Sequence, residues 1–231
     1  MKSKKIFKIT LLVVVLVAVI AGGIYAKKRY LDPRIKLSSA NEEVQRLDNK
    51  NQLQEWDLIF HTSQSRQCKA VQLATKSIYT HCGLIIKRNG EFYVLEAVQP
   101  VKLTRLRNFI ARGKDNEYVI KRLKESEKIL TPEVKEKMNK ISNEWVGKNY
   151  DLTFEWSDDK IYCSELIWKI FQRSAGIEVG KIQKLKEFDL TSKEVKEIIQ
   201  QRYGVKIPYE EPVISPQSVF ESEMLVEVGI N

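Results

Sequence analysis

The sequence has few of the residues on which disulfide scaffolds and metal sites depend. Its 231 residues include three cysteines and two histidines, in none of the usual zinc-ligand spacings. So small and odd a number of cysteines excludes a disulfide-based fold. The sequence also lacks internal repeats and long low-complexity stretches, which excludes solenoids and disordered chains. We therefore expect one globular domain that uses no metal and no other cofactor.

The chain lacks a basic excess where a nucleic-acid-binding domain would need one. Its net charge is +9, but residues 1–36 contain nine basic residues and one acidic residue. The remainder contains 30 basic and 29 acidic residues. Binding to nucleic acid requires a basic patch on the folded domain, so nucleic acid is not an expected partner.

The basic residues of the N-terminus flank an apolar run, residues 9–26. Its 18 residues are at the lower limit for a membrane-spanning helix, and the run is slightly long for the apolar part of a signal peptide. Both interpretations stay open, with an uncleaved anchor slightly favoured. Either one places the domain outside the cytoplasm, in the periplasm or at the cell surface. We expect an anchor or signal segment over 1–36, a stalk over 37–51 and a folded domain over 52–231.

Helical and strand patterns are mixed along the domain, which predicts an α+β fold. We expect helices at 41–53, 65–75, 104–111, from Thr131-Pro132 to Gly147, at 163–175, at 191–204 and from Ser215-Pro216 onward. We expect single strands at 56–60, 118–123 and 224–228, beside one hairpin.

The hairpin consists of residues 81–86 and 92–97 around Asn89-Gly90, the preferred pair for a type I′ turn. A two-residue turn fixes the register, so His81, Gly83 and Glu96 project from the same face. Glu96 is then the diagonal neighbour of His81, with backbones about 7–8 Å apart. A carboxylate in this position can hold the imidazole in one tautomer, as the third member of a catalytic triad does.

Cys163 is expected at the first residue of a helix. The free N–H groups and the macrodipole of a helix N-terminus favour a thiolate. The same N–H groups can stabilise the oxyanion that forms when a thiolate attacks a carbonyl. With His81 as its base, Cys163 would be the nucleophile of an acyl transfer.

Each candidate also has a structural interpretation. Cys163 can be a small buried apolar residue and His81 a core histidine. Glu96 is harder to explain in this way, because it interrupts an apolar strand and a buried carboxylate without a partner is costly. The other histidine, His61, is expected in a loop or at the surface, with a contact to substrate left open. Cys82, on the opposite hairpin face from His81, is assigned to packing, as is Cys68.

The order of four motifs resembles that of a known family. These motifs are Trp56-Asp57-Leu58-Ile59-Phe60, Tyr79-Thr80-His81-Cys82-Gly83-Leu84, Val94-Leu95-Glu96-Ala97 and Tyr162-Cys163-Ser164-Glu165-Leu166. Over residues 52–226 the chain resembles the YiiX-like hydrolases, which are circularly permuted papain-fold enzymes related to NlpC-type cell-wall peptidases. The resemblance implies that Cys163 is the nucleophile, His81 the base and Glu96 the orienting acid. It also implies that the helix of Cys163 packs against the antiparallel sheet of His81. The family's first strand usually opens with Gly-Asp, and here Trp56 precedes Asp57.

Three functions remain in competition. The leading hypothesis is an extracytoplasmic amidase or peptidase that acts on peptidoglycan peptides or another amide. The second is a lipid acyltransferase or esterase on the same fold, which the membrane segment would hold near its substrate. The third is a catalytically silent binding module at the membrane. The presence of Cys163, His81 and Glu96 together argues against it, because a binding module has no need for this set.

Overall fold

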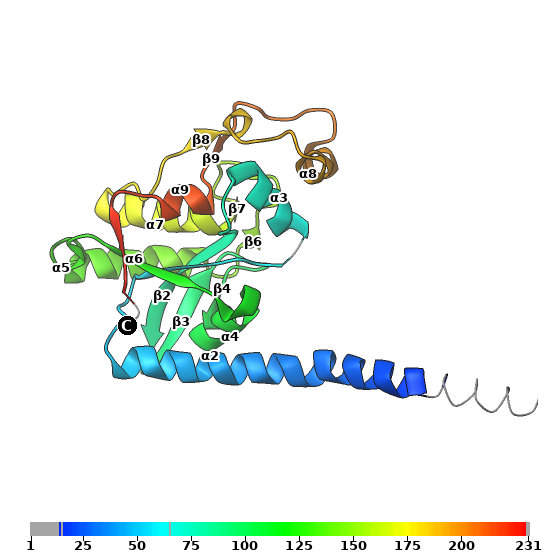
Figure 1. Ribbon diagram of the computed structural model, residues 1–231. Helices are drawn as coiled ribbons and strands as arrows, with labels where there is room; N and C mark the ends of the chain where they lie inside the picture. Colours follow the sequence, from blue (N-terminus) through cyan, green and yellow to red (C-terminus); the bar gives the residue numbers. More distant parts are fainter. Residues whose placement is uncertain (1–13, 15, 65, 230–231) are drawn as a thin grey trace, which may run out of the picture.

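The computed structural model describes residue 14, residues 16–64 and residues 66–229. Its centre is a six-stranded antiparallel sheet with the strand order β10-β5-β1-β2-β3-β4 (Figure 1). In chain order the strands of this sheet are β1 (Leu58–His61), β2 (His81–Arg88), β3 (Glu91–Glu96), β4 (Lys102–Arg105), β5 (Val119–Leu123) and β10 (Leu225–Glu227). Two short ladders pair β6 (Asn149–Tyr150) with β7 (Lys160–Ile161), and β8 (Gln183–Lys184) with β9 (Pro212–Val213).

Helices cover the sheet and extend beyond one of its ends. The α-helices are α2 (Asp32–Asn49), α3 (Arg66–Thr75), α4 (Leu106–Arg112), α5 (Ser126–Ile129), α6 (Pro132–Trp145), α7 (Cys163–Ala175), α8 (Lys193–Tyr203) and α9 (Pro216–Phe220). Shorter helical segments of other geometry are η1 (Lys27–Leu31), η2 (Lys114–Asn116) and η3 (Leu185–Glu187). The mixed fold agrees with the predicted α+β class, in which an antiparallel sheet packs against the helix that begins at Cys163.

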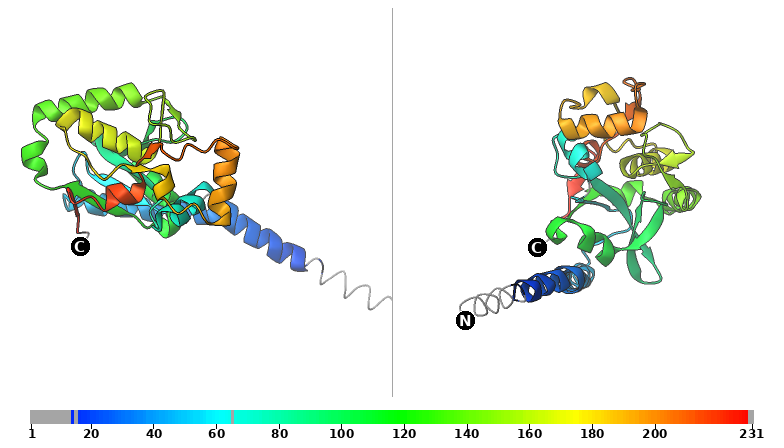
Figure 2. Two further views of the ribbon diagram at one scale, coloured as in Figure 1. Left: turned by 90° about the horizontal axis from the view of Figure 1, so that it is seen from above. Right: turned by 90° about the vertical axis from the view of Figure 1, so that its right-hand side faces the viewer.

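Helices α6 and α7 lie side by side and cover one face of the sheet (Figure 2). Alternate strand residues, Phe60, Cys82 and Leu84, point to this face and pack with Leu166 and Ile167 of α7. The alternation follows the strand pleat, and a large apolar side chain such as Phe60 or Leu84 contributes about 1.5–3 kcal/mol when it is fully buried. This packing fixes the start of α7 against β2.

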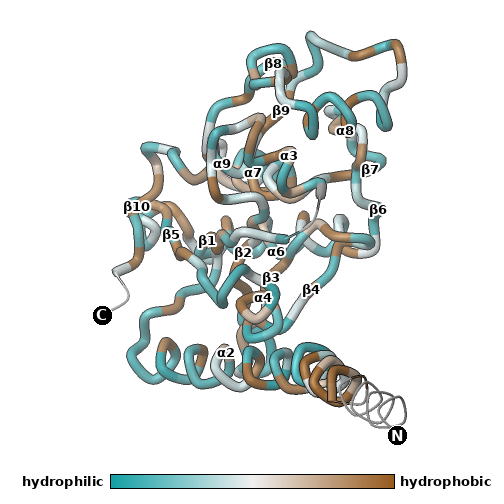
Figure 3. The backbone as a smooth tube through the Cα atoms, turned by 45° about the vertical axis from the view of Figure 1, so that its right-hand side comes forward, coloured by the Kyte–Doolittle hydropathy of each residue, from teal (hydrophilic) through white to brown (hydrophobic). Residues whose placement is uncertain are grey.

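Helices α2 and α4 cover the opposite face of the sheet (Figure 3). Ile59 and Ile85 point to this side and pack with Phe109 of α4. Ala40 and Leu47 of α2 are 1% and 0% exposed in the same cluster. Residues 37–49, within the segment expected to be a stalk, thus belong to a helix that is packed on the domain. This helix begins earlier and ends earlier than the predicted 41–53.

Beyond one end of the sheet, α3 packs against α8 through Ala70, Val195 and Ile199. The predicted capping box at Thr191 is displaced by one residue, because Ser192 is the N-cap and accepts from the Val195 N–H. Thr131 and Ser215 cap α6 and α9 as predicted.

The hairpin has the predicted register, with Arg88 opposite Glu91 and Leu84 opposite Leu95. Both turn residues, Asn89 and Gly90, have positive φ, as a type I′ turn requires. The next expected helix is shifted, because residues 102–105 form the strand β4 and α4 begins only at Leu106.

Trp56 occupies a backbone conformation that favours glycine. Its φ is 72°, and its side chain is 1% exposed within the core beside α7. The next residue, Asp57, accepts two hydrogen bonds from Arg122, at 2.7 and 2.8 Å. The position where the Gly-Asp pattern has glycine is therefore left-handed in this chain, a conformation that glycine adopts without strain and that tryptophan rarely adopts.

The expected membrane segment, residues 9–26, lies partly outside the described residues. Residues 16–26 are helical and continue through η1 into α2. Among the residues that the structure describes, no helix is long and apolar enough to cross a membrane.

Candidate active site

His81 and Glu96 form a buried pair at one end of the sheet. The Nε2 atom of His81 lies 2.6 Å from Oε2 of Glu96, and the two residues are 8% and 0% exposed. His81 is the first residue of β2 and Glu96 the last of β3, on the same hairpin face as the register predicts. With Nε2 held by Glu96, Nδ1 is the ring nitrogen left for the sulfur of Cys163.

Gly83 makes room for this pair. A Cβ atom at this position would come within 2.4 Å of Cγ1 of Val94 and 2.8 Å of the Leu95 carbonyl oxygen. It would also lie 3.4 Å from Cβ of Glu96. Any larger residue would displace the backbone of β3, and with it the carboxylate of Glu96.

Cys163 is the first residue of α7, as predicted, and Tyr162 is the N-cap. Two hydrogen bonds tie the start of this helix to the chain before α9. The hydroxyl of Ser164 donates to the carbonyl of Ile214 at 2.8 Å, and the N–H of Ile214 donates to the Tyr162 hydroxyl at 3.0 Å. Glu165 accepts from the Tyr162 N–H at 3.4 Å. The position of Cys163 is therefore fixed from both sides.

The electrostatics of the three groups favour a charged pair. Hydrogen bonds from Cys82 and then from His81 lower the pKa of Cys163 well below its ordinary 9.0, although burial opposes this. Burial would lower the pKa of His81, but hydrogen bonds with Cys163 and Glu96 outweigh it and raise this pKa from 6.5 to about 10. Burial would raise the pKa of Glu96, but His81 and Arg112 lower it to about 2. A thiolate, an imidazolium and a carboxylate thus stabilise one another.

Cys82 takes part in the site, which the sequence did not indicate. It lies on the hairpin face that α7 covers, and its thiol and backbone N–H both hydrogen-bond to Cys163. Burial, together with this contact, raises the pKa of Cys82, so it stays a thiol and donates. The prediction that Cys82 packs in the core is correct but incomplete. The missing fact was that the helix of Cys163 lies on this face of the hairpin.

Thr104 and Arg112 complete the surroundings of Glu96. The Thr104 hydroxyl donates to Oε1 at 2.5 Å, and the Arg112 guanidinium donates to Oε2 at 2.6 Å. Sequence analysis missed both, because the pairing of β4 with β3 and the direction of the last turn of α4 depend on tertiary packing. A buried carboxylate does predict that partners exist, but not which residues they are.

His61 is buried, contrary to the expectation of a loop or surface position. It is 1% exposed, pairs with His81 across β1 and β2, and stacks on Phe109 with ring centroids 4.2 Å apart. Burial, and then the neighbouring His81, lower the pKa of His61 to about 3. His61 is therefore neutral, and its ring lies against the base without adding a charge.

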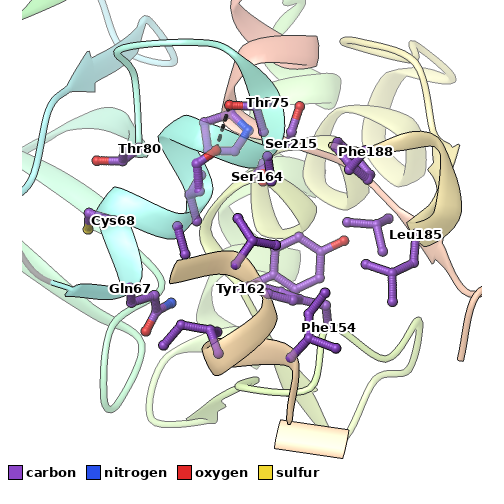
Figure 4. A pocket seen from close by; sticks show the side chains of 18 of the residues that line it. Gln67, Cys68, Thr75, Thr80, Phe154, Tyr162, Ser164, Leu185, Phe188 and Ser215 are labelled. Carbon is purple, nitrogen blue, oxygen red and sulfur yellow. Dashed lines mark hydrogen bonds between the residues drawn. The ribbon is translucent and has the colours of Figure 1, made fainter. Parts of the chain in front are cut away.

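A cavity of about 110 Å³ extends from Cys163 between α7, α3 and α8 (Figure 4). Its walls are mostly aliphatic and aromatic side chains, including Leu185, Phe188 and Phe154. Cys68 of α3 also lines it, so this residue lies nearer to the site than its assignment to packing suggested. An apolar substrate group can therefore lie beside the sulfur of Cys163.

A sheet that carries a histidine and an acid ahead of a cysteine at a helix N-terminus defines the circularly permuted, papain-like class of cysteine hydrolases. Residues 52–229 match the family model described as "Permuted papain-like amidase enzyme, YaeF/YiiX, C92 family". The chain belongs to this permuted papain-like amidase family, as its resemblance to YiiX-like hydrolases indicated.

Two relatives extend this finding. The chain is 46% identical over 178 residues to the "Uncharacterized protein YiiX" of Escherichia coli K12, with 77% of this chain and 87% of that protein covered. It also matches the "Crystal structure of metalloprotein yiiX from Escherichia coli O157:H7, DUF1105", with a TM-score of 0.73 and 46% identity. That match covers 78% of this chain and 98% of the other.

The relative with a crystal structure is described as a metalloprotein, which raises the question of whether the residues of this chain suit a metal. Within the described part of the chain, no group of three or more His, Cys, Asp or Glu side chains is placed to hold a metal ion. The neighbours of Cys163 are instead a thiol and an imidazole whose other nitrogen is already bound to a carboxylate. This arrangement fits a charged nucleophile–base pair and not a metal site.

Proposed function

We propose that this protein is an extracytoplasmic cysteine hydrolase that cleaves an amide bond, with Cys163 as nucleophile, His81 as general acid and base and Glu96 as the orienting acid. The observation that supports this most strongly is that Cys163 begins a helix beside a cavity, with His81, hydrogen-bonded to Glu96, close enough for Cys163 to raise its pKa. Membership of the amidase family supports the hydrolase class.

The first half of the reaction transfers the acyl group to the enzyme. The thiolate of Cys163 attacks the substrate carbonyl carbon, and the free N–H groups at the start of α7 stabilise the resulting oxyanion. The His81 imidazolium then gives its proton to the leaving amine nitrogen as the C–N bond breaks. A thioester on Cys163 and a neutral imidazole remain.

The second half restores the enzyme. Neutral His81 takes a proton from water as the water oxygen attacks the thioester. The C–S bond then breaks, releasing the carboxylic acid product and the Cys163 thiolate. Through both halves Glu96 holds the imidazole ring and offsets its positive charge, while Thr104 and Arg112 hold Glu96 in turn. No step passes through a metal.

Peptidoglycan peptides are the substrates that we place first, because a domain outside the cytoplasm would meet them there. The N-terminal sequence supports this location, because an apolar run with basic flanks precedes the domain. Fractionation of cells that produce the full chain tests this location. Recovery of the protein in the cytosolic fraction would contradict it.

A lipid acyltransferase or esterase is the second candidate, and one observation favours it. The cavity beside Cys163 is lined largely by aliphatic and aromatic side chains, which suit an acyl chain better than a sugar. An ester and an amide pass through the same acyl-enzyme, so the catalytic groups do not distinguish them.

Turnover assays separate these functions. Purified protein is incubated with muropeptides and with phospholipid vesicles, and the products are identified by mass spectrometry. We expect amide cleavage that disappears in Cys163→Ala. Release of fatty acid from the vesicles would favour the lipid enzyme. Turnover of neither substrate, with a ligand bound intact, would favour a silent binding module.

A further inference from the structure

The cavity beside Cys163 contains one arginine. Arg202 lies near the end of α8, and it is the only Lys, Arg, Asp or Glu among the described residues that line the cavity. Gln67, the one side-chain amide among the described lining residues, is already occupied, because it donates to the Tyr150 hydroxyl at 3.2 Å. A single cation in a wall whose other side chains are uncharged and mostly apolar therefore needs an explanation.

Arg202 has no acidic partner in the part of the chain that the structure describes. Its guanidinium carbon lies 4.7 Å from the centre of the Phe154 ring, and no hydrogen bond or ion pair to its side chain is found there. Arg202 is half-buried, and burial lowers its pKa, because a cation that is partly shielded from water is less stable in its charged form.

The acid whose charge Arg202 senses is already engaged. Asp151 raises the pKa of Arg202, but only through space. One oxygen of Asp151 accepts from the N–H and hydroxyl of Thr153, and the other from the N–H of Glu155. Other cations of the domain are paired directly: Arg122 with Asp57, and Lys169 with Glu165 and Asp158. Arg202 differs from these in having its donors available.

Tyr150 connects Arg202 to the nucleophile. It lines the same cavity as Cys163 and Arg202. Burial, and then the charge of Cys163, raise the pKa of its hydroxyl, whereas the charge of Arg202 lowers it. Both charges therefore lie within a short electrostatic range of one hydroxyl. A ligand that extends from the sulfur of Cys163 past Tyr150 would reach the guanidinium.

We propose that Arg202 binds a carboxylate of the substrate, so that the preferred substrate is an amide with an aliphatic portion and a free carboxylate on the side that enters the cavity. An arginine fork matches a carboxylate with two parallel hydrogen bonds, and such bonds are stronger in a site that excludes water. The aliphatic walls accept the chain between the reacting carbonyl and this carboxylate. This inference deepens the proposed function and rests on it.

A pair of alkylating reagents tests the inference without a known substrate. Both carry an iodoacetamide group on a five-carbon chain, which ends in a carboxylate in 6-(iodoacetamido)hexanoic acid and in a neutral carboxamide in its primary amide. The measured quantity is the ratio of the second-order rate constants for labelling Cys163, carboxylate over carboxamide. We expect Arg202→Gln to lower this ratio about tenfold, because it removes a charge-assisted pair, and Arg202→Lys to give an intermediate ratio.

The matched control is Lys196→Gln, which removes one positive charge from the exposed side of the same helix. This change should leave the ratio within about twofold of the wild-type value, since exposed charges are screened by salt. If the neutral reagent labels a variant at the wild-type rate, that variant is folded. A ratio that Arg202→Gln leaves unchanged would overturn the role of Arg202. Failure of both reagents to label Cys163 in the wild type would instead overturn the proposed function.

Discussion

At the scale of single residues, the catalytic groups depend on a chain of partners. Glu96 is the residue that converts His81 from a core histidine into a base, and two bonds to Thr104 and Arg112 hold it in place. The hairpin register made the His81–Glu96 contact predictable from Asn89-Gly90 alone. The partners of Glu96 were not predictable, because they come from β4 and α4, whose placement on the hairpin is a tertiary property.

The substitution Glu96→Gln tests this dependence. Loss of the carboxylate lowers the pKa of His81 below its value of about 10, and with less imidazolium beside it the pKa of Cys163 rises. We expect the pH midpoint for alkylation of Cys163 to move upward and amide turnover to fall about 10²-fold or more. An unchanged midpoint would show that Glu96 does not act on the nucleophile. Glu91→Gln, on the exposed start of the same strand, is the control.

Trp56 offers a test of backbone strain. Both Trp56→Ala and Trp56→Gly empty the same core position, at a cost of about 3–5 kcal/mol. Because φ is 72° here, only glycine adopts the conformation without strain. We expect the glycine variant to have the higher free energy of unfolding of the two, by about 0.5–1 kcal/mol, in urea denaturation. A more stable alanine variant would contradict a strained turn.

At the scale of elements, α7 is the part that the site depends on most. Lys169, one turn after Glu165, contacts it at 2.7 Å and also binds Asp158 at 2.9 Å. Glu165 in turn accepts from the N-cap of the helix. This network ties the loop before β7 to the first turns of α7, close to Cys163.

The network should make stability depend on pH. Burial raises the pKa of Glu165 from 4.5 to about 7, an effect that its bonds with Lys169 only partly offset. The group therefore contributes fully to stability below pH 4.5, and this contribution is lost as the pH rises through about 7. Glu165→Gln removes this titration, so from pH 5 to pH 8 the wild type should lose about 2–3 kcal/mol relative to the variant. The same difference in free energy of unfolding between the wild type and Glu165→Gln at pH 5 and at pH 8 would contradict this.

Helix α2 is predicted to be part of the folded domain. Leu47 of α2 is fully buried against the sheet, whereas Leu37 of the same helix is 40% exposed. We expect Leu47→Ala to lower the free energy of unfolding by about 2–5 kcal/mol and Leu37→Ala to change it by about 0.5 kcal/mol or less. Equal effects in urea denaturation would show that α2 is not docked in solution.

At the scale of the whole molecule, the sequence determined the elements better than their layers. Capping residues and the turn at Asn89-Gly90 located α6, α7, α9 and the hairpin, since these depend on local chemistry. The sequence did not show that the sheet lies between two pairs of helices, α6 and α7 on one side and α2 and α4 on the other. That arrangement buries His61 and brings Cys82 to the nucleophile. Burial on both faces of a sheet depends on packing partners that are distant in the sequence.

The central claim is that Cys163 is a thiolate because His81, held by Glu96, is protonated beside it. The most direct measurement is the rate of iodoacetamide labelling of each cysteine at mildly acidic pH, read by mass spectrometry, in the wild type and in His81→Ala. We predict selective labelling of Cys163 in the wild type and strong suppression in the variant, in which its pKa returns toward the ordinary 9.0. Equal labelling of Cys68, no labelling of Cys163, or an unchanged rate in His81→Ala would contradict the account.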